Sequence, residues 1–80
     1  MIKRGADVKY EIFLKRMGKS IRIIRKSKKL KQEDLAKLCG VNQNYISDIE
    51  NGKRNITMLK IFDIAEALNI DVAVIFQQIE

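Results

Sequence analysis

The sequence predicts an all-α fold, a compact domain of five short helices, and three observations carry this prediction. Apolar side chains recur every three or four residues along most of the chain, as they do on the buried face of an amphipathic helix. No stretch alternates apolar and polar residues over the length of a β-strand. The chain has 80 residues, no proline and no low-complexity linker, which leaves room for one domain.

The first predicted helix is an apolar stripe that ends near Lys28. Its members step by four, three, four and three positions: Tyr10, Leu14, Met17, Ile21 and Ile24. Gly18 falls inside this stripe and costs a helix about 1 kcal/mol relative to alanine. The helix is therefore expected either to bend at Gly18 or to begin there. Residues 1–17 are accordingly predicted to be an N-terminal arm or the start of the first helix, and residues 18–80 the folded domain.

Two short helices joined by a turn are predicted next. The first covers residues 32–39, and Gly40 ends it because glycine readily adopts a positive φ. Asn42 is the predicted N-cap of the second, since its amide oxygen can accept a free backbone N–H. Ala36 is small enough for close approach of the two helices, and the branched Val41 fills the angle between them. This combination predicts a helix-turn-helix.

The fourth predicted helix begins after Thr57, which is a good N-cap. Its next eleven residues are apolar except for three: Lys60, Asp63 and Glu66. A helix with so few polar positions is expected to lie at the centre of the core.

The last predicted helix opens at Asp71 and is apolar from Val72 to Phe76, with Ile79 further along. One short helix cannot turn this much apolar surface inward, and exposed apolar patches usually mark interfaces. The sequence therefore predicts a twofold homodimer with these contacts: Ile70, Val74 and Phe76. The alternative is that the same residues only close the core.

Charge is divided unevenly along the chain. Residues 1–31 hold 12 basic and 2 acidic side chains, 12 − 2 = +10, and residues 32–80 hold 4 basic and 8 acidic ones, 4 − 8 = −4. Such asymmetry favours a polyanionic partner, either nucleic acid or an anionic membrane surface. The membrane alternative is the weaker one, because no strongly apolar helix face accompanies the basic residues.

Several classes of protein are excluded by composition. No apolar run approaches the roughly 18 residues of a membrane span, and a lone Cys39 favours a reducing, cytoplasmic setting. With one cysteine and no histidine, a Cys/His zinc site and a histidine-based catalytic triad are both ruled out. We expect neither enzymatic activity, nor a metal, nor a cofactor, and Cys39 is best explained as a small buried residue.

The polar face of the third helix points to double-stranded DNA. Carboxamides and hydroxyls gather in its first two turns, at Asn42, Gln43, Asn44, Tyr45, Ser47 and Asp48. Carboxamides can pair with adenine in the major groove. A purely structural surface helix would more often carry Lys and Glu, since Asn is a mediocre helix former. The alternative is that these are ordinary capping and solvated residues.

The segment IRIIRKSKKLKQEDLAKLCGVNQNYISDIENGKRNITMLKIFDIAEALNI, residues 21–70, resembles the Cro/repressor-type helix-turn-helix family. The resemblance implies a five-helix domain of the phage-repressor type, with residues 43–51 as the recognition helix. It implies base contacts from Gln43, Asn44 and Asp48. Asn42 and Ser47 are assigned to the bases as well, although either could contact a phosphate instead. It implies phosphate contacts from Gln32, Tyr45, Asn51, Lys53 and Arg54. Arg25 and Glu50 match a structural ion pair of the family.

The small size, the loop RNIT and the apolar C-terminal run are similar to those of the controller proteins of restriction–modification systems. That resemblance implies a homodimeric transcription regulator on a pseudo-palindromic operator, acting on RNA polymerase through its sigma subunit. A phage-type repressor has much the same DNA-reading segment. An antitoxin-like module that also binds a protein partner is the remaining alternative.

Overall fold

The structure is a computed structural model that describes residues 2–77. This part of the chain forms five helices and no strand, as predicted. The helices are α1 (Gly5–Ser27), α2 (Gln32–Cys39), α3 (Gln43–Glu50), α4 (Met58–Ala67) and α5 (Val72–Gln77). Ile79 lies outside the described residues. None of these helices is long and apolar enough to cross a lipid bilayer.

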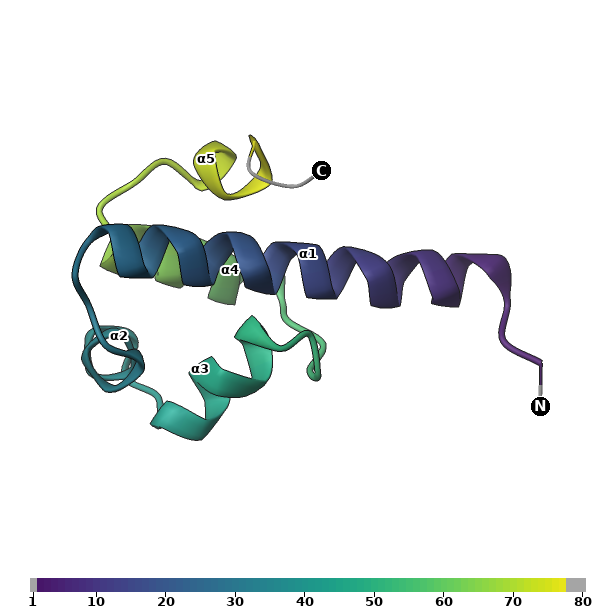
Figure 1. Cartoon of the computed structure of the whole chain (residues 1–80), viewed down its shortest axis with the longest axis horizontal. Coiled ribbons are helices and arrows are strands. Elements are labelled where there is room, and N and C mark those ends of the chain that lie inside the picture. The colour runs from purple at the N-terminus through teal and green to yellow at the C-terminus, as the bar shows by residue number, and fades with distance from the viewer. Residues whose placement is uncertain (1, 78–80) are drawn as a thin grey trace.

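α1 is the longest helix, and the other four gather around its C-terminal half (Figure 1). α2 and α3 lie on one side of α1 and α5 lies on the opposite side. The core between them contains completely buried side chains from four of the helices: Ile21, Leu35, Ile46 and Ile64. Ile75 of α5 is equally buried and its carbonyl accepts a hydrogen bond of 2.7 Å from Ser20. The N-terminal half of α1 projects beyond the other helices.

α1 is continuous through Gly18, so the helix does not begin there. The glycine is explained by packing. A Cβ atom at Gly18 would lie 2.3 Å from the carbonyl oxygen of Ile49 and 2.6 Å from that of Glu50. The C-terminal end of α3 therefore rests directly on the α1 backbone, and only glycine permits this approach.

The expectation that α4 lies at the centre of the core is wrong. One face of α4 is buried, through Ile61, Ile64, Ala65 and Leu68. Three large apolar side chains outside this face are exposed: Met58 (57% exposed), Leu59 (73%) and Phe62 (52%). A ten-residue helix at the edge of a small bundle has neighbours on one side only, so its remaining apolar residues face outward.

Candidate nucleic-acid interface

The turn between α2 and α3 is closed by local hydrogen bonds. Gly40 adopts the left-handed conformation, with φ of 68°, and the N–H of Val41 donates to the carbonyl of Ala36 at 3.0 Å. α3 then begins with the predicted cap, because Oδ1 of Asn42 accepts the N–H of Tyr45 at 2.9 Å. This geometry fixes the direction in which α3 leaves α2.

A buried ion pair fixes the other end of α3 to α1. Arg25 donates to the two carboxylate oxygens of Glu50, from Nε at 2.7 Å and from Nη2 at 3.0 Å. The guanidinium also donates to the carbonyl of Leu30 at 2.7 Å. Both side chains of the pair are buried, at 7% and 1% exposed. Together with the buried Ile46 and Ile49, this pair places α3 against α1.

The side of α3 that faces away from the core is polar. Since successive residues of a helix are about 100° apart, Asn44 and Asp48 lie opposite the buried Ile46 and Ile49. Ser47 and Asn51 share this outward side, while Gln43 and Tyr45 lie at its two edges. The structure therefore brings together on one helix face most of the residues that the sequence predicted for DNA contact. Asn42 caps the helix with its amide oxygen, which leaves both N–H groups of its amide nitrogen available for a further contact.

Hydrogen bonds connect Gln43 to the buried ion pair. Nε2 of Gln43 donates to Oε1 of Gln32 at 3.4 Å, and Nε2 of Gln32 donates to Glu50 at 3.1 Å. A glutamine with such support loses less conformational entropy when it forms a further contact. Gln32 itself lies between α2 and α3, half-buried, and its amide serves this connection.

The loop after α3 adds positive charge beside the outward face. The Arg54 guanidinium lies 4.6 Å from the centroid of the Tyr45 ring and donates to Asp48 at 3.4 Å. Asn51 donates to the carbonyl of Ser47 at 2.9 Å. Lys53 is exposed. A basic loop of this kind suits the phosphate backbone, whereas the carboxylate of Asp48 suits the amino group of cytosine.

The residues predicted for a dimer interface are half-buried by the chain itself. Ile70, Val74 and Phe76 all pack partly against the core. The ring of Phe76 stacks on that of Phe13, with 6.1 Å between centroids, so the N-terminal part of α1 covers some of the apolar surface of α5. None of the three is among the most exposed apolar side chains, which lie elsewhere.

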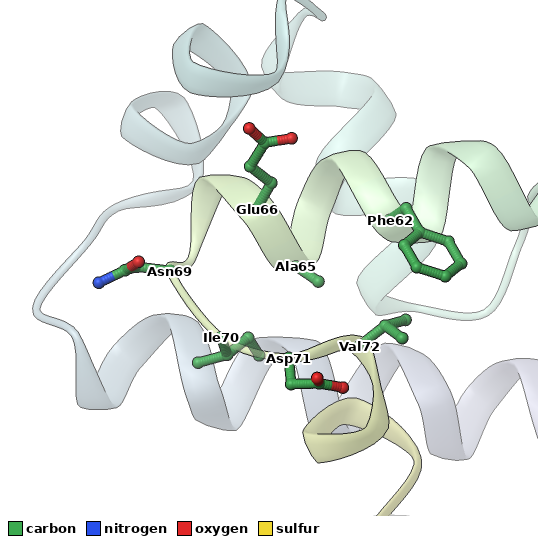
Figure 2. Close-up of a pocket in the computed structure, with 7 residues that line it drawn as sticks. All are labelled: Phe62, Ala65, Glu66, Asn69, Ile70, Asp71 and Val72. Carbon is green, nitrogen blue, oxygen red and sulfur yellow. The ribbon is translucent and has the colours of Figure 1, made fainter.

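α4 carries an apolar surface that is more exposed than the predicted interface residues and that was not predicted from the sequence. Leu59 and Phe62 lie on its outward side and are more exposed than any of the predicted interface residues. Phe62 also borders a hollow between α4 and α5, with Val72 on its other rim and Ile70 in its wall (Figure 2). The signal was present in the sequence, because α4 carries more apolar residues than one buried helix face can hold.

Within residues 2–77 no cluster of three or more His, Cys, Asp or Glu side chains is placed to hold a metal ion. Burial, followed by the nearby carboxylate of Asp63, raises the pKa of the Cys39 thiol above its ordinary value. The thiol therefore stays protonated near neutral pH and is a weak nucleophile.

Five helices with a short turn between α2 and α3, and a polar face on α3, define a helix-turn-helix domain. Comparison with known proteins identifies the family to which this domain belongs. The chain belongs to the Helix-turn-helix family, whose model matches residues 21–75.

Several similar proteins are named as regulators. Control protein C.MunI of a Mycoplasma species is 36% identical over 66 residues, which are 81% of this chain and 89% of the relative. The ImmF control region 10 kDa protein of Bacillus phage phi105 is 39% identical over 61 residues, 76% of this chain and 68% of the relative. The crystal structure of the restriction-modification controller protein C.AhdI from Aeromonas hydrophila superimposes with a TM-score of 0.77 at 36% identity, covering 79% and 96% of the two chains.

Proposed function

We propose that the protein is a sequence-specific DNA-binding transcription regulator of the restriction–modification controller type. It acts in the cytoplasm as a homodimer on a pseudo-palindromic operator and performs no catalysis. The observation that carries the proposal is the polar outward face of α3, which a buried ion pair and a capped turn hold on the helix-turn-helix scaffold. The similarity to controller proteins across most of the chain supports the particular class.

In this proposal α3 enters the major groove. Gln43, Asn44, Ser47 and Asp48 contact base edges, with Asn42 at the start of the helix. The other predicted residues contact phosphates and set the register of the protein on the duplex: Gln32, Tyr45, Asn51, Lys53 and Arg54. Of these, Lys53 and Arg54 carry the charge that makes binding sensitive to salt.

Selection of bound sequences from a random duplex library tests the proposal. We expect a palindromic consensus whose half-sites lie one helical turn apart, about 34–36 Å, or a multiple of that distance. A consensus without symmetry would contradict binding as a twofold dimer. Failure to enrich any sequence would contradict sequence-specific DNA binding altogether.

Replacement of Gln43 by alanine tests base recognition. Binding to the selected duplex is expected to weaken by about 1–3 kcal/mol, because a bidentate base contact is lost, with little change on random DNA. Titration of the labelled selected duplex and of a random duplex measures both effects. Gln77→Ala removes a carboxamide from the exposed surface of α5 and serves as the control. Equal losses on the two duplexes would identify Gln43 as a phosphate contact instead.

The α4 surface is the part of the molecule best suited to a second copy. We propose that the interface is built from Leu59 and Phe62 together with the hollow beside them, and extends to the predicted Ile70, Val74 and Phe76. An exposed aromatic side chain beside a concave surface of mixed polar and apolar residues is typical of an interface residue that contributes much of the binding energy. A small domain of this size also gains stability from association.

Replacement of Phe62 by aspartate tests this interface. The dimer is expected to weaken by about 2 kcal/mol or more, because a charge replaces an aromatic contact at the centre of the buried surface. Sedimentation equilibrium measures the dissociation constant. Ile23→Asp is the matched control, since Ile23 is similarly exposed, at 49%, but lies on α1. If both variants stay dimeric, or both dissociate equally, α4 is not the interface.

The contact with RNA polymerase and the sign of the transcriptional response are also part of the proposal. Activation of transcription requires contact with RNA polymerase, and we propose that acidic residues of 32–80 meet its sigma subunit. A bacterial two-hybrid assay with the sigma subunit as the partner tests this contact. The similarity to the immunity repressor protein of Bacillus phage phi105, 36% identical over 59 residues, supports repression as the second candidate function. A reporter placed behind the selected site distinguishes activation from repression by the sign of its response.

A further inference from the structure

The first part of α1 contributes no residue to the DNA contacts proposed above. The family model matches from residue 21 onward, but α1 begins at Gly5. At 1.5 Å per residue, the additional helix is roughly 24 Å long. Within this additional helix Leu14, Met17 and Ser20 are buried in the core. The turns before Leu14 form an exposed extension, which projects past the other helices in Figure 1.

One face of α1 is basic. Lys15, Lys19, Arg22 and Lys26 are spaced by four, three and four residues, which places them in one line along the helix. All four are exposed, and none forms an ion pair with any residue between 2 and 77. We call these four residues the α1 basic stripe.

The N-terminal end of this stripe lies beside the loop that follows α3. A Cβ atom at Gly52 would lie 2.7 Å from Cγ of Lys15 and 2.8 Å from its Cα and N. The backbone of the loop is therefore in close contact with α1 at Lys15. The next two residues of this loop are Lys53 and Arg54, the basic residues proposed for phosphate contact. The stripe and the loop thus form one continuous basic surface next to α3.

The acidic residues of the extension do not oppose this charge. Asp7 pairs with Arg4, and Glu11 pairs with Lys3. These pairs neutralise both carboxylates that precede the stripe. Between Lys15 and Lys26 the only exposed large apolar side chain of α1 is Ile23, since Val8, Tyr10 and Ile12 all precede the stripe. A polyanion therefore fits this face better than an apolar partner does.

We infer that the α1 basic stripe binds duplex phosphates next to those contacted by the loop after α3, and so widens the site that each protomer covers. This inference rests on the proposed function. Contacts of this kind carry no sequence information, and each neutralised phosphate adds about −0.9 to the slope of log affinity against log salt. The stripe thus supplies affinity, while α3 supplies specificity.

The test compares two double variants of equal net charge. Lys15→Gln with Lys19→Gln removes charge from the stripe beside the loop. Lys9→Gln with Arg16→Gln removes the same charge from another face of α1, where both residues line a shallow hollow with Phe13 on the side of α5. Fluorescence titrations with the selected duplex and with a random duplex of equal length, at several salt concentrations, give affinity and slope.

The stripe variant is expected to lose affinity by the same factor on both duplexes, and its slope should become shallower by about 1.8 for two contacts. The control variant should keep the wild-type slope. Equal slopes in both variants would overturn the inference, because the effect would then come from net charge. If the first stripe variant proves unfolded by circular dichroism, Arg22→Gln with Lys26→Gln takes its place.

The outcome separates this inference from the proposed function. A wild-type protein that prefers the selected duplex, with unchanged slopes in the stripe variants, overturns only the phosphate contacts of α1. A wild-type protein without any preference between the duplexes overturns the proposed operator binding, while the slopes still report on the stripe. Stripe-dependent binding to phosphatidylglycerol vesicles, with no effect on either duplex, would also overturn the inference.

Discussion

A Glu50→Ala variant is expected to lose about 3–5 kcal/mol of unfolding free energy, a large part of the stability of a small domain. The substitution leaves the guanidinium of Arg25 buried without its counter-ion, and a buried charge without a partner is strongly unfavourable. It also removes the acceptor of Gln32, which is the residue that supports Gln43. At about 4–8 °C per kcal/mol for a domain of this size, the melting temperature should fall by more than roughly 12 °C.

Thermal unfolding followed by circular dichroism measures this loss. The matched control is the double variant Arg25→Met with Glu50→Leu, in which neither charge remains. Apolar replacement of a buried ion pair is often close to neutral, so the double variant should recover more than half of the loss. A single variant that melts within about 4 °C of the wild type would show that the pair is hydrated and contributes little.

The fold was largely predictable because its determinants are local. Gly40 has the conformation that ends α2, and Asn42 and Thr57 both accept backbone N–H groups at the starts of their helices. Each of these depends on a residue and its neighbours three or four positions away. The number and order of the helices follow from such signals together with the apolar period.

The features that were mispredicted depend on contacts between distant residues. Gly18 was interpreted by its helix propensity, whereas its position is required by the α3 carbonyls some thirty residues later. The apolar run of α4 was assigned to the core, but its neighbours cover only one side, and Leu59 faces outward. Periodicity shows which residues share a face, and it does not show how many faces the surrounding helices will cover.

The same difference between local signals and contacts of distant residues applies to the candidate DNA-binding site on α3. The polar residues of α3 were predicted as a set, because their number and chemistry are unusual for a surface helix. The hydrogen bonds that orient them were not predicted, since they join α3 to other segments. Gln43 is supported by Gln32 of α2, and Asp48 by Arg54 of the following loop. Only the folded structure shows that these side chains are already held in place by other parts of the chain.

A Gly18→Ala variant is expected to lose about 3 kcal/mol of stability, even though alanine is the better helix former by about 1 kcal/mol. The added methyl group would lie 2.3–2.8 Å from backbone atoms of Ile49 and Glu50, which is closer than any real contact. These atoms belong to the end of α3, so the helix itself must move rather than a flexible side chain. Such a shift would also displace the outward face of α3 from the geometry that base contacts require.

Gly5→Ala provides the control for this last prediction. Gly5 is in the same helix, and a Cβ atom there meets nothing within 4 Å, so this variant should be as stable as the wild type or slightly more stable. Thermal unfolding compares the two, and titration of the selected duplex well below both melting temperatures compares their binding. If Gly18→Ala were as stable as Gly5→Ala, α3 would not rest on the α1 backbone. If it were destabilised yet bound DNA normally, α3 would not need this support to present its recognition face.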